Sequence, residues 1–168
     1  MSFRLYSDIG VYLLGYYRVH YDNQNWQLLA EDLLKNPSAI PTENRAQILH
    51  DVLHLALADG DFMAQALNVT RFLQQDDDVV VWMSGVKVLR ELNDIVGPTA
   101  AYNAFAGYAR KMLTKVYAKR GLNPQRKPED IEGGLIRAYV SPYACTFGLT
   151  ECLKDARLLI NKILEGSR

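Results

Sequence analysis

The sequence predicts a mainly α-helical protein in which a short N-terminal β segment precedes stacked antiparallel helix pairs. Three observations support this fold class. β-branched and aromatic residues are concentrated before residue 22. Beyond that point, apolar residues recur every three or four positions. Short connections that contain Pro or Gly separate the periodic segments, so successive helices pack as antiparallel neighbours. No strict repeat period occurs, which leaves a short α-solenoid and an irregular bundle as alternatives.

Composition excludes several classes of protein. Hydrophobic residues make up 49% of the 168-residue chain, which is enough apolar surface to offset the entropy of folding, so intrinsic disorder is excluded. The 19 Lys and Arg residues equal the 19 Asp and Glu residues and lie among them, which argues against a nucleic-acid partner. No apolar run is long enough to span a membrane. Arg4 and Asp8 interrupt the apolar run that a secretory signal requires.

Residues 1–21 are predicted to form a β segment, and residues 22–168 a helical domain. In the first helix, Asp22 is expected to be the N-cap and Asn36-Pro37 to end it. The apolar residues of this helix are spaced so that they share one face. They are Trp26, Leu29, Ala30, Leu33 and Leu34.

Two helices are predicted next, and an acidic run follows them. The first is expected to start with Thr42 as N-cap and to run to Gly60. The second is expected to cover residues 62–73. The acidic run, Asp76 to Asp78, would place negative charge at the N-terminus of the following helix, where the helix dipole favours it.

The last part of the chain is predicted to contain four helices. The first of these ends at Gly97-Pro98, the second covers about residues 99–120, and a basic loop at 122–127 precedes the third. Pro142 is expected to kink or end the third helix. The fourth begins near Leu149, and one set of its apolar residues is expected to face inward. This set is Cys152, Leu153, Ala156, Leu159, Ile160, Ile163 and Leu164.

The segment from His50 to His54 is the strongest sign of metal chemistry. The two imidazoles lie one helical turn apart and could reach one zinc ion, as in the H-E-x-x-H motif. Asp51 stands where that motif has its Glu, however, and is one methylene shorter. The position nineteen residues after His54, where a third ligand would stand, is Leu73. We therefore expect two half-exposed structural histidines, with adventitious metal binding as the alternative, and no catalytic residue, bound metal or cofactor in this chain.

Cys145 and Cys152 admit three interpretations: a disulfide, two unrelated buried thiols, or half of a metal site. On a continuous helix their Cα atoms would lie about 10 Å apart, beyond the disulfide limit of about 7 Å. A bond between them therefore requires a chain reversal. Phe147-Gly148 offers one, because Gly accepts the left-handed conformation that ends a helix.

Asn68 begins an N-x-T triplet, the acceptor sequence for N-linked glycans. It is the only usable triplet, because Pro37 blocks the one at Asn36. Such triplets also arise by chance, so a glycan site and an ordinary helical Asn remain alternatives.

Five segments, in this order, resemble the C-terminal helical domain of zinc-dependent aminopeptidases of the aminopeptidase N type. The segments are GYYRVHYD at 15–22, NPSAIP at 36–41, NRAQ at 44–47, ALNVT at 66–70 and the two-cysteine segment at 144–152. Around Pro142 the sequence is similar to insect gut enzymes of this type. The resemblance covers most of the chain.

The resemblance implies that the chain comprises the last strand of a β-sandwich and the first half of a HEAT-like helical domain. It also implies a Cys145–Cys152 disulfide, an extracellular or luminal parent anchored at the cell surface and, if the triplet faces solvent, a glycan at Asn68. The family's catalytic residues and zinc ligands lie upstream of any residue present here, so the chain alone is expected to be inactive.

The partners implied by the resemblance are the remaining aminopeptidase domains, the parent's peptide substrate and a second copy in a homodimer. In the intact enzyme this domain is expected to cap the catalytic cavity, where zinc would be bound. A stand-alone helical protein-interaction module is the alternative function.

Overall fold

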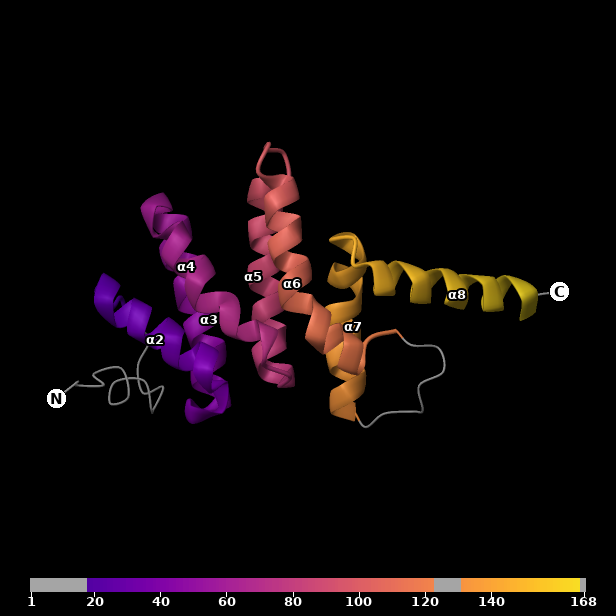
Figure 1. Cartoon of the computed structure of the whole chain (residues 1–168), viewed down its shortest axis with the longest axis horizontal. Helices are drawn as coiled ribbons and strands as arrows, with labels where there is room; N and C mark the ends of the chain where they lie inside the picture. Colours follow the sequence, from indigo (N-terminus) through magenta and orange to yellow (C-terminus); the bar gives the residue numbers. More distant parts are fainter. Residues whose placement is uncertain (1–17, 123–130, 167–168) are drawn as a thin grey trace. The chain divides into compact units, whose positions relative to one another are not determined.

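The structure, a computed structural model, describes residues 18–122 and 131–166. These residues form seven α-helices and three short 3-10 helices, and no strand occurs among them (Figure 1). The mainly α-helical prediction is confirmed. The predicted β segment falls almost entirely outside the described residues, and the last four of its positions, 18–21, belong to no helix or strand.

The chain divides into two compact units, Met1–Val88 and Leu89–Arg168, and the division falls inside one helix, α5. The first unit contains α2 (Asn23–Lys35), α3 (Thr42–Ala58), α4 (Met63–Val69) and the start of α5 (Val79–Val96). The 3-10 helices are η1 (Pro37–Ala39), η2 (Gly60–Phe62) and η3 (Thr70–Gln74). Helix α2 packs against α4 and η3, and α3 packs against α4 (Figure 1).

Apolar spacing accounts for the core of the first unit. Four of the five residues predicted to share one face of α2 are almost completely buried, and the fifth, Leu34, is partly buried. Residues at helical intervals on α3 and large side chains of η3 and α5 complete the core. Asp22 caps α2, since its carboxylate accepts a hydrogen bond from the backbone N–H of Asn25 at 2.8 Å. The largest buried side chains are Trp26, Leu29, Leu33, Leu49, Leu53, Phe72, Leu73 and Trp82.

Two predicted helix boundaries in the first unit are wrong. Thr42 does not cap α3: Pro41 is the N-cap, and the Thr42 hydroxyl instead donates a hydrogen bond to Asp78 at 3.0 Å. The helix predicted over 62–73 is α-helical only as far as Val69 and continues from Thr70 as the 3-10 helix η3. The Thr70 hydroxyl donates a hydrogen bond to the Leu67 carbonyl at 3.0 Å. Such local bonds to the backbone compete with regular helix geometry.

The acidic run behaves as predicted at its last residue. Asp78 accepts hydrogen bonds from the N–H groups of Val80 and Val81, at 2.9 and 3.4 Å, and so provides acceptors at the start of α5. Asp76, in contrast, is buried, and its side chain forms an ion pair with Arg45 of α3.

In the second unit, α6 (Tyr102–Arg120) packs against α7 (Ile131–Thr146), which packs against α8 (Thr150–Gly166). Of the two expected effects of Pro142, a kink or an end of the helix, the second does not occur, because α7 continues to Thr146. Pro142 removes one helical hydrogen bond, to the carbonyl of Ala138. Both residues are exposed, so water can satisfy that carbonyl. The predicted loop at 122–127 lies beyond the described residues except for Leu122.

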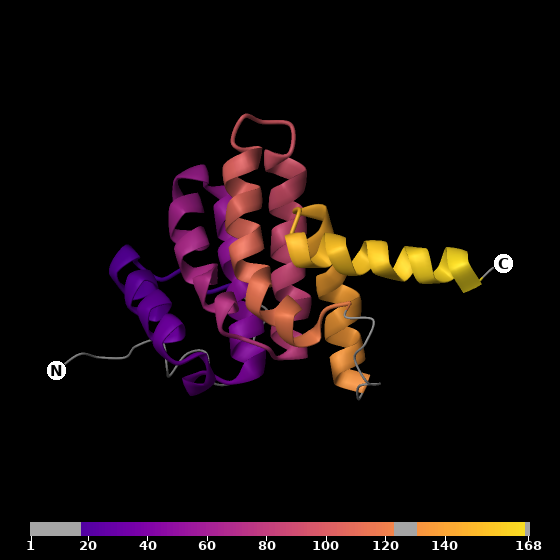
Figure 2. The ribbon, with the colours of Figure 1, turned by 45° about the vertical axis from the view of Figure 1, so that its right-hand side comes forward.

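The expectation that α8 is buried along one face is wrong for most of the helix. Only Cys152 is buried on it, whereas Ile163 and Leu164 are 66% and 62% exposed. In both views the last turns of α8 extend away from α6 and α7 (Figure 2). No helix in the described part of the chain has both the length and the apolar content to cross a membrane.

Candidate functional site

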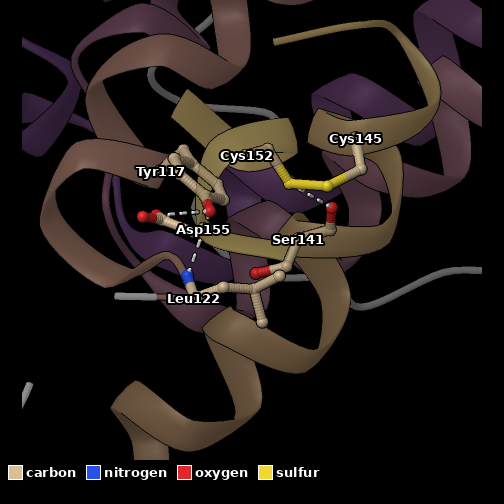
Figure 3. Close-up of a disulfide and its surroundings, with 6 residues drawn as sticks. All are labelled: Tyr117, Leu122, Ser141, Cys145, Cys152 and Asp155. Atoms are coloured by element: carbon tan, nitrogen blue, oxygen red, sulfur yellow. Dashed lines mark hydrogen bonds between the residues drawn. A yellow bond between two sulfur atoms is a disulfide. The ribbon is translucent and has the colours of Figure 1, made fainter. Parts of the chain in front are cut away.

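A disulfide joins the end of α7 to the start of α8. Cys145 and Cys152 are bonded, with Cα atoms 5.2 Å apart (Figure 3). Gly148 makes the required chain reversal with φ of 77°, in the left-handed region that favours glycine. The N–H of Leu149 closes the turn on the carbonyl of Ala144 at 2.8 Å. The structure thus confirms both the pairing and the reversal at Gly148.

Polar contacts from α6 hold the same turn between α7 and α8, which we call the disulfide corner. The Tyr117 hydroxyl donates to Asp155 on α8 at 2.9 Å and accepts from the Leu122 N–H at 3.3 Å (Figure 3). Arg110 donates to the carbonyl of Phe147 at 2.8 Å. Cys152 Sγ lies 3.3 Å from the Ser141 carbonyl oxygen, a contact rather than a hydrogen bond because a disulfide sulfur carries no hydrogen. These contacts tie the disulfide corner to α6.

Removal of the disulfide is expected to lower the free energy of unfolding by about 2.5 kcal/mol, from the chain-entropy cost of closing so short a loop. Cys145→Ser combined with Cys152→Ala tests this by urea denaturation. Reductant added to the unmodified chain should produce a similar loss and have no further effect on the double variant. Equal midpoints for the variant and the oxidised chain would show that the cross-link does not stabilise the fold.

His50 and His54 form a close pair on α3. Their Nε2 atoms are 3.1 Å apart, and the ring centroids are 4.3 Å apart. The side chain of His50 is 35% exposed. The prediction of two partly exposed histidines on one helix flank is therefore confirmed, and the structure adds that the two rings are in contact.

A catalytic zinc site does not fit these histidines. No group of three or more His, Cys, Asp or Glu side chains able to hold a metal ion occurs among residues 18–122 and 131–166. Leu73, at the position of the missing ligand, is buried in the apolar core. The carboxylate of Asp51 accepts a hydrogen bond from Gln47 at 2.7 Å, so it is engaged within its own helix.

Asp51 is a buried carboxyl group that the sequence interpretation did not recognise as such. It is 6% exposed, and burial raises its pKa above the ordinary value. The Gln47 amide, the charges of His50 and Arg18, and the Val19 N–H act in the opposite direction.

A raised pKa makes stability depend on pH. The folded chain holds a proton on Asp51 at pH values where the unfolded chain has released it, so the free energy of unfolding falls as pH rises from about 4 through the raised pKa. In the Asp51→Asn variant, residue 51 carries no titratable carboxyl group, so this pH dependence is absent. The stability of the unmodified chain relative to this variant should therefore decline as pH rises from about 4 through the raised pKa of Asp51. A difference that grows with pH in denaturant titrations would contradict this assignment.

Arg45 and Asp76 form a buried ion pair, at 2.7 Å, with 8% and 2% of their side chains exposed. Arg45 also donates to the carbonyl of Ile40 at 2.6 Å, and the Asp76 backbone carbonyl accepts from the Trp82 indole at 2.8 Å. The pair thus joins α3 to the segments before it and to α5. One sequence signal could have revealed it: Arg45 shares the buried face of α3 with Leu49.

Asn68 is half buried near the end of α4 and accepts a hydrogen bond from Arg71 at 3.3 Å. Thr70, the third residue of the triplet, is 3% exposed. Glycosylation at Asn68 remains a prediction.

The described residues are helical in both compact units, and the disulfide lies in the second. Residues 13–168 match the family described as the ERAP1-like C-terminal domain, and the chain belongs to that family.

The chain is similar to several curated aminopeptidases. It is 29% identical to the thyrotropin-releasing hormone-degrading ectoenzyme of Homo sapiens over 174 residues, which cover 97% of the chain and 16% of that relative. Aminopeptidase N of Homo sapiens is 30% identical over 155 residues, covering 90% of the chain and 16% of the relative. Aminopeptidase Ey of Gallus gallus is 30% identical over 148 residues, covering 86% and 15%. The chain thus spans about a sixth of these relatives, and the resemblance to an aminopeptidase C-terminal domain is confirmed.

Proposed function

We propose that this chain is a non-catalytic part of the C-terminal domain of a metallo-aminopeptidase that removes N-terminal residues from peptides. The observation that carries the proposal is the family match over residues 13–168, together with relatives named as aminopeptidases. The helical fold agrees with it.

The catalytic step is assigned to a part of the parent enzyme outside this chain. In such an enzyme, zinc supplies a polarised water for attack on the scissile carbonyl, with a Glu as base. The described residues offer no three-ligand set for a catalytic ion. The contribution of this chain is therefore structural: its cross-linked helices would form walls that cap the catalytic cavity and limit the peptides admitted, and they could contribute to dimer contacts.

An extracellular or luminal location of the parent, at the cell surface, belongs to the same proposal. One of the relatives is named an ectoenzyme. The Cys145–Cys152 disulfide adds support, because disulfides persist in oxidising compartments. Glycosylation of Asn68 would be compatible with such a location.

The exposed apolar residues of α8 fit a domain that works within a larger enzyme. Ile160, Ile163 and Leu164, which helical spacing places on one face, are each more than half exposed. Extended exposed apolar faces commonly mark surfaces that other protein covers. The same face is the one observation that favours a stand-alone interaction module, but family membership supports the aminopeptidase proposal more directly.

The native transcript provides the test. We expect one reading frame to join this helical segment to an upstream H-E-x-x-H motif, and the full-length product to release amino acids from peptide N-termini. A mature transcript that encodes the helical segment without any catalytic region would overturn the proposal and favour the interaction module.

A further inference from the structure

We propose that His50 and His54 form a two-imidazole chelating site for a divalent late transition metal ion, separate from any catalytic zinc. Two histidines at positions i and i+4 share one face of a helix, so α3 presents both rings on the same side. The two Nε2 atoms, which are the atoms that would bind the ion, are the ones that approach each other.

The separation of these atoms matches what one ion requires. With metal–nitrogen distances of about 2.0–2.1 Å, two ligand nitrogens stand about 3.3 Å apart at a tetrahedral angle and about 2.9 Å apart at a right angle. The observed distance is 3.1 Å. The lone pairs can converge on one ion through small rotations of the rings, since χ2 of histidine is a broad torsion.

The surroundings of His50 also suit a metal ligand. Its Nδ1 is buried, has no hydrogen-bond partner, and lies 3.8 Å from a carboxylate oxygen of Asp51. A metal-bound histidine usually carries its remaining proton on the other ring nitrogen, where a carboxylate can accept it. At 3.1 Å one Nε2 atom can donate a hydrogen bond to the other, and a bound ion would replace that proton.

The ligand set indicates the class of ion. Two imidazoles favour Cu²⁺ over Ni²⁺ and Zn²⁺, and they give little affinity for Mg²⁺ or Ca²⁺, which need oxygen ligands. No group of three or more metal-binding side chains includes the pair in the described parts of the chain. The site is therefore expected to bind an ion without the enclosed geometry of a structural zinc site.

The test is a Cu²⁺ titration of the full chain by calorimetry, with glycine as a competing chelator. The chain contains three histidines, which provides a matched control: His20→Gln removes the one outside the pair, an exposed ring against Phe62. We expect one ion per chain in the unmodified protein and in His20→Gln. His50→Gln and His54→Gln should each weaken binding by about tenfold or more. Circular dichroism establishes that each variant is folded.

Two measurements on the unmodified chain do not depend on any variant. The electron paramagnetic resonance spectrum of the Cu²⁺ complex should show coupling to two imidazole nitrogens, and Cu²⁺ should raise Tm whereas Mg²⁺ should not. Equal Cu²⁺ affinity in the chain and in the His50→Gln/His54→Gln double variant would overturn the proposal. So would a lack of measurable Cu²⁺ binding, or a spectrum without two-nitrogen coupling.

Discussion

Replacing Arg45 with methionine is expected to lower the free energy of unfolding by about 3–5 kcal/mol, the usual cost of breaking a buried ion pair from one side. The substitution leaves the Asp76 carboxylate, 2% exposed, without its guanidinium partner. It also removes the donor to the Ile40 carbonyl. Urea denaturation followed by circular dichroism measures the loss.

The matched control is Lys35→Met, which breaks an exposed ion pair with Glu31. That pair has a distance of 3.9 Å, with 71% and 49% of the side chains exposed, so its loss should cost no more than about 1 kcal/mol. Similar small losses for Arg45→Met and Lys35→Met would show that the buried pair does not anchor the first unit.

Trp82→Ala is expected to destabilise the chain by about 3–5 kcal/mol, as is usual when a large aromatic side chain is removed from a core. Trp82 is 0% exposed, so the truncation leaves a cavity among the buried residues. It also removes the indole donor to the Asp76 carbonyl. Thermal and urea unfolding should both report the change.

Trp82→Phe separates the two causes. Phenylalanine retains much of the packing but cannot donate to the Asp76 carbonyl, so it should cost about 1–3 kcal/mol, the penalty of one unsatisfied buried acceptor together with a smaller packing loss. If Trp82→Ala destabilised the chain no more than Trp82→Phe, the packing of the indole could not be the main contribution.

Much of the helical fold could be predicted because apolar periodicity is a local signal. The stripe that includes Trp26, Leu29 and Leu33 is buried as expected, and Asp22 caps its helix. Details that depend on distant residues could not be predicted in this way. The Thr42 hydroxyl bonds to Asp78, 36 positions away, rather than to its own helix. The face of α8 is apolar, but periodicity does not say whether another part of the chain covers it.

The disulfide corner could be predicted from the sequence only in part. Spacing showed that pairing of the cysteines needs a reversal, Gly148 offered one, and the resemblance implied the bond that the structure contains. The Arg45–Asp76 pair was missed because the acidic run was interpreted only as charge at a helix start. A charged residue on an otherwise apolar helical face was the available signal, since burial of such a charge requires a partner.

The proximity of His50 and His54 follows from helix spacing, but the 3.1 Å distance and the neighbouring Asp51 carboxylate do not. Spacing places two rings on one face, whereas rotamers and packing decide which atoms meet. The sequence alone therefore indicated that a zincin-like site lacks its third ligand, but not that the two Nε2 atoms approach each other.

The central claim is that this chain contributes structure, while bond cleavage belongs to another region of the parent enzyme. Incubating the purified 168-residue chain with an aminoacyl anilide, with and without added zinc, tests it most directly. We expect release of the aniline at the rate of buffer alone in both conditions. Zinc-dependent hydrolysis that a chelator stops and that the His50→Gln/His54→Gln variant lacks would contradict the claim.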